Sequence, residues 1–222
     1  MLNFLNLNNI LALLCVLILS SCSTSQPKNK WQYNAVNMTQ TYQSHFLQAK
    51  ESHARIDLRQ ARRHAKQSAD LKVLIDIELT QCAMQVCVLK FQNCKNARSL
   101  LIIQPNASQE AYLSFLNSTL QEKDINLLPQ QYQGFAYALE KKNAEGINKI
   151  LKNIRPLSSK VISSSLSRDF ITQENISLLI KELSFSGYKH PLISWLKLQA
   201  SREKDTTKKL RIQAKIEVLT SE

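Results

Sequence analysis

Cys82, Cys87 and Cys94 are the thiols of the central part of the chain, and they could either bind a metal or form a disulfide. A structural zinc site needs four ligands, commonly with two cysteines in a CxxC pair. No CxxC occurs here, and the nearest histidine in the sequence is His64. The spacing therefore favours disulfide chemistry, and we expect neither a metal nor a cofactor.

The histidines also offer metal or acid–base chemistry. His53 and Asp57 are four residues apart, which places both on one face of a helix. His64 lies among Arg62, Arg63 and Lys66, whose charges disfavour a bound cation. We expect His45, His53 and His64 to be solvated and to bind no metal.

Serine is concentrated in residues 158–165, beside Lys160. Nucleophilic catalysis needs a base and an orienting group next to the nucleophile, and no GxSxG pattern is present. The three glycines stand far apart, which excludes GxGxxG and Walker phosphate-binding loops. We interpret the serine-rich segment as a packing face or a capped loop, and we expect no catalytic site.

A band of cations is the strongest surface feature. The chain has 29 Lys+Arg against 17 Asp+Glu, a net charge of +12, and a second basic cluster lies at 204–215. Cationic bands attract acidic protein surfaces, lipid headgroups or cell-wall carboxylates, although a solvated face that keeps the protein soluble is the alternative interpretation. The candidate partner-binding band consists of Arg55, Arg59, Arg62, Arg63 and Lys66.

The elements that would position these groups are predicted to be helices. Apolar residues recur at steps of three and four almost throughout, and 44% of the residues are hydrophobic, enough to form a core. A strand over 73–79 is the one alternative. Opposite the basic band, one helical stripe contains Ala54, Leu58, Ala61, Ala65 and Ala69.

Start and stop signals divide the chain into short helices. Ser108 and Thr172 suit helix N-caps, and Gly187 suits a left-handed helix end. Short loops between helices favour antiparallel packing of neighbours. The predicted fold class is all-α, with antiparallel helix hairpins forming an α-solenoid or an irregular bundle.

The N-terminal segment has the features of a signal peptide for export. Ile10–Leu19 is an apolar run about 15 Å long as a helix, too short to span a bilayer and typical of a signal-peptide core. Its ending, Leu19-Ser20-Ser21-Cys22, resembles the lipobox of bacterial lipoproteins. That resemblance implies cleavage after Ser21, and Ser23 resembles the sorting signal for the outer membrane. The start of the chain lacks the usual Lys or Arg, and an ordinary secretory signal with an incidental cysteine is the alternative.

The lipobox resemblance implies a division of the chain. Residues 1–21 are then the signal peptide, residues 22–38 the lipidated cysteine and a flexible tether, and residues 39–222 an all-helical, repeat-like domain. We expect a location in the cell envelope, anchored by acyl chains on Cys22, in the outer membrane and facing the periplasm. Nucleic acid is not expected as a partner in that compartment.

Export to an oxidising compartment favours one disulfide among the three central thiols. If a helix ends near Lys90, Cys94 can fold back onto its last turn, so Cys87–Cys94 is the preferred pair. Cys82–Cys94 is the alternative, since Cys82 lies deeper in the helix.

Part of the helical region resembles a tetratricopeptide repeat. Asp57-Leu58-Arg59-Gln60-Ala61 is similar to the opening of the second helix of that repeat, and Leu79 to Val86 is similar to the first helix of the next. The likeness covers about residues 42–90, and His45, Gln48 and Val73 depart from the pattern. It implies helix hairpins that present an extended surface for a protein partner.

These observations predict a non-catalytic lipoprotein that acts as a protein-binding scaffold or an envelope assembly factor. One alternative is a cell-wall or lipid-modifying enzyme. Another is a basic module that binds peptidoglycan or anionic lipid through the cationic bands.

Overall fold

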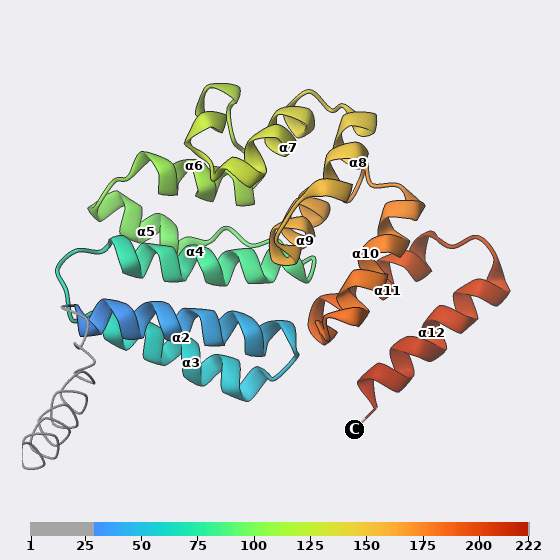
Figure 1. Ribbon diagram of the computed structural model, residues 1–222, viewed down its shortest axis with the longest axis horizontal. Coiled ribbons are helices and arrows are strands. Elements are labelled where there is room, and N and C mark those ends of the chain that lie inside the picture. The colour runs from blue at the N-terminus through green and yellow to red at the C-terminus, as the bar shows by residue number, and fades with distance from the viewer. Residues whose placement is uncertain (1–28, 222) are drawn as a thin grey trace, which may run out of the picture.

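The computed structural model describes residues 29–221 (Figure 1). The signal segment 1–21, with Leu19, Ser20 and Ser21, and the proposed anchor Cys22 lie outside these residues, so their assignment stays a prediction.

The described part of the chain consists of helices and connecting turns and contains no strand. This confirms the predicted all-α fold class. The segment 73–79, for which a strand was the alternative, is helical. In chain order the elements are α2 Lys30–Leu47, α3 Glu51–Ala65, α4 Lys72–Cys87, α5 Lys95–Ile103, α6 Ala107–Leu116, the 3-10 helix η1 Glu122–Leu127, α7 Gln130–Glu140, α8 Ala144–Asn153, α9 Leu157–Leu166, α10 Gln173–Phe185, α11 Lys189–Arg202 and α12 Thr206–Thr220.

The first helix starts earlier than the predicted domain boundary. Because α2 begins at Lys30, residues 30–38 belong to the folded domain, and their assignment to a flexible tether was wrong. Ala35 is completely buried in this segment, which gives these residues a packing role.

The α2–α3 hairpin packs through small side chains. Ala54, Leu58, Ala61 and Ala65 are buried along α3, as the stripe predicted, and Ala61 has no exposed surface. Small residues at these positions let the backbones of α2 and α3 approach closely. Ala69 is exposed because α3 ends at Ala65, so its place on the stripe was wrong.

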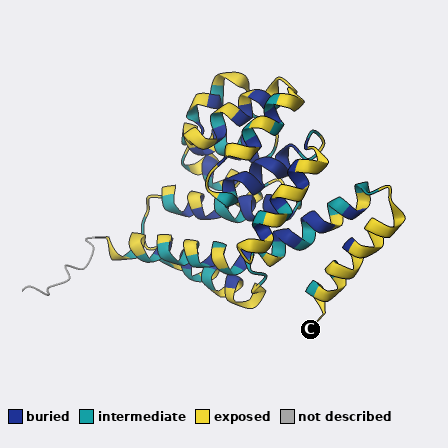
Figure 2. Ribbon diagram, turned by 45° about the vertical axis from the view of Figure 1, so that its right-hand side comes forward, coloured by how far each residue is buried: buried dark blue, intermediate teal, exposed yellow. Residues whose placement is uncertain are grey.

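The core centres on α4 and α9, which contact each other and are covered by the other helices (Figures 1 and 2). Every residue of α9 from Ser159 to Leu166 is buried. This confirms the interpretation of the serine-rich segment as a packing face. A run of small hydroxyl side chains fits there because neighbouring helices surround α9.

Consecutive helices pack as hairpins, notably α2 with α3, α7 with α8, α10 with α11, and α11 with α12. The chain then returns on itself, since α11 contacts α2. His190 of α11 lies against Phe46 of α2, with 4.6 Å between ring centroids and 3.3 Å from His190 Nδ1 to the Phe46 carbonyl oxygen. This contact and the buried α9 make the domain an irregular bundle of hairpins.

The tetratricopeptide register does not fit the helix boundaries. Asp57 and Leu58, placed at the opening of a second helix, lie in the middle of α3, and the turn falls at 48–50. The segment from Leu79 to Val86 does lie within one helix, α4. The hairpin packing was therefore predicted correctly, but the position of the repeat was wrong.

Helix ends follow local capping chemistry. Thr172 caps α10 by accepting a hydrogen bond from the Asn175 N–H, as predicted. The cap of α6 is Asn106, which accepts from the Gln109 N–H, so Ser108 was the wrong residue. Gly187 follows α10 with a φ of 66°, the left-handed conformation that glycine adopts most easily.

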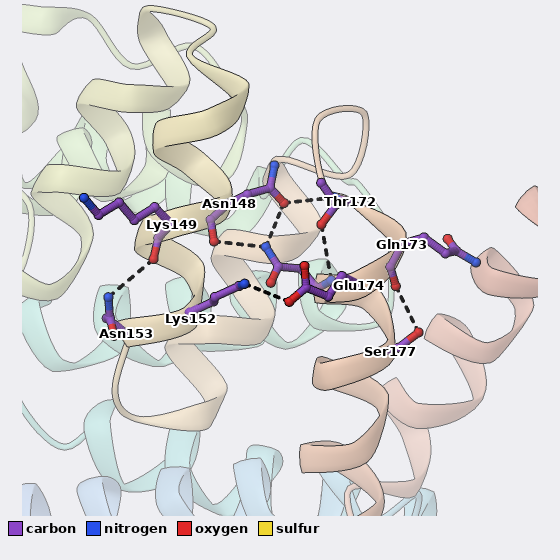
Figure 3. A network of polar contacts seen from close by, with 9 residues as sticks. Asn148, Lys149, Lys152, Asn153, Thr172, Gln173, Glu174 and Ser177 are labelled. Atoms are coloured by element: carbon purple, nitrogen blue, oxygen red, sulfur yellow. Dashed lines mark hydrogen bonds and ion pairs between the residues drawn. The ribbon is translucent and has the colours of Figure 1, made fainter.

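Asn148 joins α8 to the start of α10 (Figure 3). Its amide nitrogen donates to the carbonyl oxygens of Ala144 and Phe170. Its amide oxygen accepts from the Thr172 N–H at 2.9 Å and from Asn175 Nδ2 at 2.7 Å. This network holds α8 against the segment that opens α10.

Within residues 29–221 no helix is long and apolar enough to cross a membrane.

Candidate functional site

The basic band lies on the outer side of α3. Arg55, Arg59, Arg63 and Lys66 are exposed, as the sequence predicted. Among the described residues no carboxylate lies within ion-pair distance of any of them. The structure therefore has a row of cations without compensating acids, on a helix whose opposite side is packed against α2 and α4.

Arg62 does not belong to this exposed row. Its guanidinium donates from Nε and Nη2 to the two carboxylate oxygens of Glu78, at 2.6 and 2.7 Å, and from Nη2 to Gln81 Oε1 at 2.6 Å. Asn96 Nδ2 donates to the same carboxylate at 3.1 Å. The prediction that Arg62 faces outward with the other cations was wrong, because the buried carboxylate of Glu78 turns its guanidinium toward α4.

The sequence contained a signal for this pair. Glu78 is only 6% exposed and lies between Ile77 and Leu79 in the apolar part of α4. A buried carboxylate needs a cation or several donors, so a basic partner on a neighbouring helix should have been expected.

The disulfide joins Cys82 to Cys94, with 5.6 Å between their Cα atoms. The preferred pair, Cys87 with Cys94, was wrong. Cys82 and Cys87 are five residues apart, about 140° around a helix, so they face different sides of α4. Cys87 points into the core as a free, buried thiol whose pKa is raised to about 12 by burial, and the loop before α5 brings Cys94 to Cys82.

A polar hollow of about 450 Å³ lies beside the disulfide, between α4 and the segment that leads into α5. Glu78 and Cys82 form part of its wall, so the Arg62 network and the disulfide both shape it. Its lining is rich in amide side chains, which both donate and accept hydrogen bonds. These amides are Gln81, Gln85, Gln92, Asn93 and Asn96.

His53 and Asp57 share one face of α3, as their spacing predicted, and both lie against His45 of α2. Asp57 Oδ2 lies 2.6 Å from Nδ1 of His45 on α2, and the ring of His53 lies beside His45 with 5.3 Å between centroids. His45 and Asp57 thus link α2 to α3. His64 lies near Gln67, with Nδ1 3.3 Å from Nε2. In the part of the chain that the structure describes, no group of three His, Cys, Asp or Glu residues is placed to hold a metal ion.

Lys160 is engaged within the fold. Its ammonium lies 2.8 and 2.9 Å from the two carboxylate oxygens of Glu182, and its side chain is 7% exposed. This ion pair joins α9 to α10. The arrangement supports a structural interpretation of the segment.

The second basic cluster lies on the C-terminal helix. Only Ile212 of α12 is buried, and the helix packs against α11. The cations of the cluster are all exposed: Lys204, Lys208, Lys209, Arg211 and Lys215.

Comparisons with protein-family models, with curated proteins and with solved structures found no match for this chain.

Proposed function

We propose that this protein is a non-catalytic lipoprotein of the bacterial cell envelope, a scaffold or assembly factor anchored through acyl chains on Cys22 in the outer membrane and facing the periplasm. Its all-helical domain, an irregular bundle of hairpins, binds a protein partner through the exposed cations of α3. The observation that carries the proposal is the uncompensated row of Arg55, Arg59, Arg63 and Lys66.

The geometry of the row suits an acidic protein segment. Arg55, Arg59 and Arg63 recur every four residues, so their guanidinium groups follow one side of a single helix. A rigid helix presents them at fixed spacing, and guanidinium binds carboxylates with two parallel hydrogen bonds. Complementary charge also speeds the encounter of two proteins and selects against basic partners.

Three charged groups, two of them on α3 itself, support a non-catalytic role because each has a structural partner. Arg62 is paired with Glu78, Lys160 with Glu182, and Asp57 with His45. The four exposed cations of α3 differ from these groups in having no such partner among the described residues.

The test is capture of envelope proteins by the immobilised lipidated protein. Arg59→Glu combined with Arg63→Glu should lower capture of the specific partner by at least about tenfold, since two favourable charge pairs become repulsive. The matched control, Lys123→Glu with Lys149→Glu, makes the same change in net charge at exposed positions on other helices and should leave capture unchanged.

A partner that is captured equally by the α3 variant and by the wild type would overturn the proposal. Equal losses in both variants would also overturn it, because they would show attraction to net charge and no role for α3. Melting temperatures of all three proteins check that each variant is folded.

A further inference from the structure

The C-terminal helix has a second face that nothing in the described structure covers. Its inner side packs on α11 through Ile212, Ile216 and Leu219, which recur on one side of the helix. Figure 2 shows α12 mostly exposed at the edge of the molecule. Leu210 and Val218 are 60% and 75% exposed.

The outer face is apolar along one stripe and cationic beside it. Leu210, Ala214 and Val218 are spaced by four residues, which places them together on the side away from α11. Arg211 and Lys215 are also four residues apart and border that stripe. Both are exposed and have no carboxylate within ion-pair distance in residues 29–221.

Another exposed apolar side chain lies at the same end of the molecule. Phe185 is 94% exposed and is the last residue of α10. Since α11 runs back from that end and α12 returns toward it, the ends of α10 and α12 both lie at the lower edge of the domain in Figure 1. Lys181 and Lys189 on either side of the α10–α11 turn are exposed cations.

The proposed anchor keeps the domain close to a membrane. The chain from Cys22 to Asn29 spans at most about 25 Å when fully extended, at roughly 3.5 Å per residue. A domain on so short a connection stays near the lipid headgroups, so one of its faces has a membrane as its nearest neighbour.

We propose that the C-terminal patch, defined as Phe185, Leu210, Arg211, Lys215 and Val218, docks on the anionic lipid surface of that membrane. The proposal rests on the proposed function for the anchor at Cys22. Apolar side chains enter the boundary between headgroups and acyl chains, while the cations lie beside lipid phosphates.

The test uses the chain from Ser23 to Glu222, which lacks the proposed signal and lipid. Every buried residue of the main core lies between Ala35 and Ile212, so this chain keeps all the contacts on which the fold depends. The measurement is sedimentation with vesicles of phosphatidylcholine alone or mixed with phosphatidylglycerol. We expect binding to the anionic vesicles only. Raising the salt from about 0.1 M to about 1 M, which shortens the screening length from about 10 Å to about 3 Å, should abolish it.

Two variants separate the contributions of charge and apolar surface. Arg211→Glu with Lys215→Glu should weaken binding at least about thirtyfold, because each cation near an anionic leaflet contributes about fivefold. Phe185→Ser should weaken it about tenfold or more through lost insertion. The matched control, Lys123→Glu with Lys149→Glu, makes the same change in net charge on other helices and should change binding less than about threefold.

Binding that does not depend on the anionic lipid, or that survives both patch variants, would overturn the proposal. A dimer in the absence of vesicles that Phe185→Ser dissociates would also overturn it, because a second copy would then cover the patch. None of these results depends on lipidation at Cys22, so failure here is distinguishable from failure of the proposed anchor.

Discussion

Arg62 and Arg63 are adjacent in the sequence and have opposite roles. Arg63 is exposed in the row on α3, while Arg62 forms two hydrogen bonds with Glu78 and one with Gln81. The pattern of cations predicted both to be on the surface. The difference arises from Glu78 on another helix, sixteen residues away along the chain, which no spacing rule within α3 can include.

Removal of Arg62 should therefore destabilise the protein. Arg62→Ala leaves the Glu78 carboxylate buried with Asn96 as its remaining side-chain donor, and the expected cost is about 3 kcal/mol. Arg63→Ala removes an exposed charge and should change stability by less than about 0.5 kcal/mol. Chemical denaturation of both variants measures the difference, and equal stabilities would contradict the assigned roles.

The thiols allow a test of connectivity. Mass mapping without reduction should recover a peptide that links Cys82 to Cys94, with Cys87 free and alkylated only after unfolding, because burial raises the pKa of its thiol to about 12. Cys94→Ser should lower stability by about 3 kcal/mol through loss of the cross-link. A Cys87–Cys94 peptide, or rapid alkylation of Cys87 in the folded protein, would show that this arrangement is wrong.

At the scale of elements, the helical structure and the buried stripe of α3 could be predicted from the sequence. Apolar residues spaced by three and four positions lie on one side of a single helix, so no knowledge of the other helices is needed. Leu58, Ala61 and Ala65 are buried as that spacing indicates. Boundaries were less predictable. The turn at 48–50 follows α2 and contains Ala49, whose φ is 62° although alanine rarely adopts this conformation and is no sequence signal for such a turn. The repeat register was therefore misplaced, and residues 30–38 were assigned to a tether.

The contact between α2 and α11 should make stability depend on pH. Burial lowers the pKa of His190 from its usual 6.5, with Lys90 lowering it further and Glu51 and the Phe46 carbonyl opposing the change. The unfolded chain then binds a proton more readily than the folded one. Stability present above pH 6.5 is therefore lost as the pH falls through 6.5 toward the folded-state pKa.

The measurement is the melting temperature across that interval. On acidification the melting temperature of the wild type should fall further than that of His190→Gln. This variant keeps a polar side chain beside the Phe46 carbonyl but cannot titrate. Parallel pH profiles for the two proteins would contradict a role for His190 in this contact.

At the scale of the whole molecule, the row on α3 and the C-terminal patch are charged surfaces whose cations have no ion-pair partner among residues 29–221. The sequence predicted the first as a band, and its basic cluster at 204–215 indicated the second without the contribution of Phe185. That residue joins the patch only because α11 runs back along α10 and α12 runs back along α11, which places the end of α10 at the same end of the molecule as the end of α12. This proximity depends on how the chain folds, so no pattern of residues within one helix could predict it.

The central claim is that acyl chains on Cys22 hold this domain at a membrane, and metabolic labelling with a radioactive fatty acid tests it most directly. Wild type and the matched control Cys15→Ala should both incorporate label, since Cys15 lies within the apolar run of the signal. Cys22→Ala should incorporate none and should accumulate as an unprocessed precursor or a soluble form. Label on Cys22→Ala equal to that on the wild type, or no label on the wild type, would contradict the account.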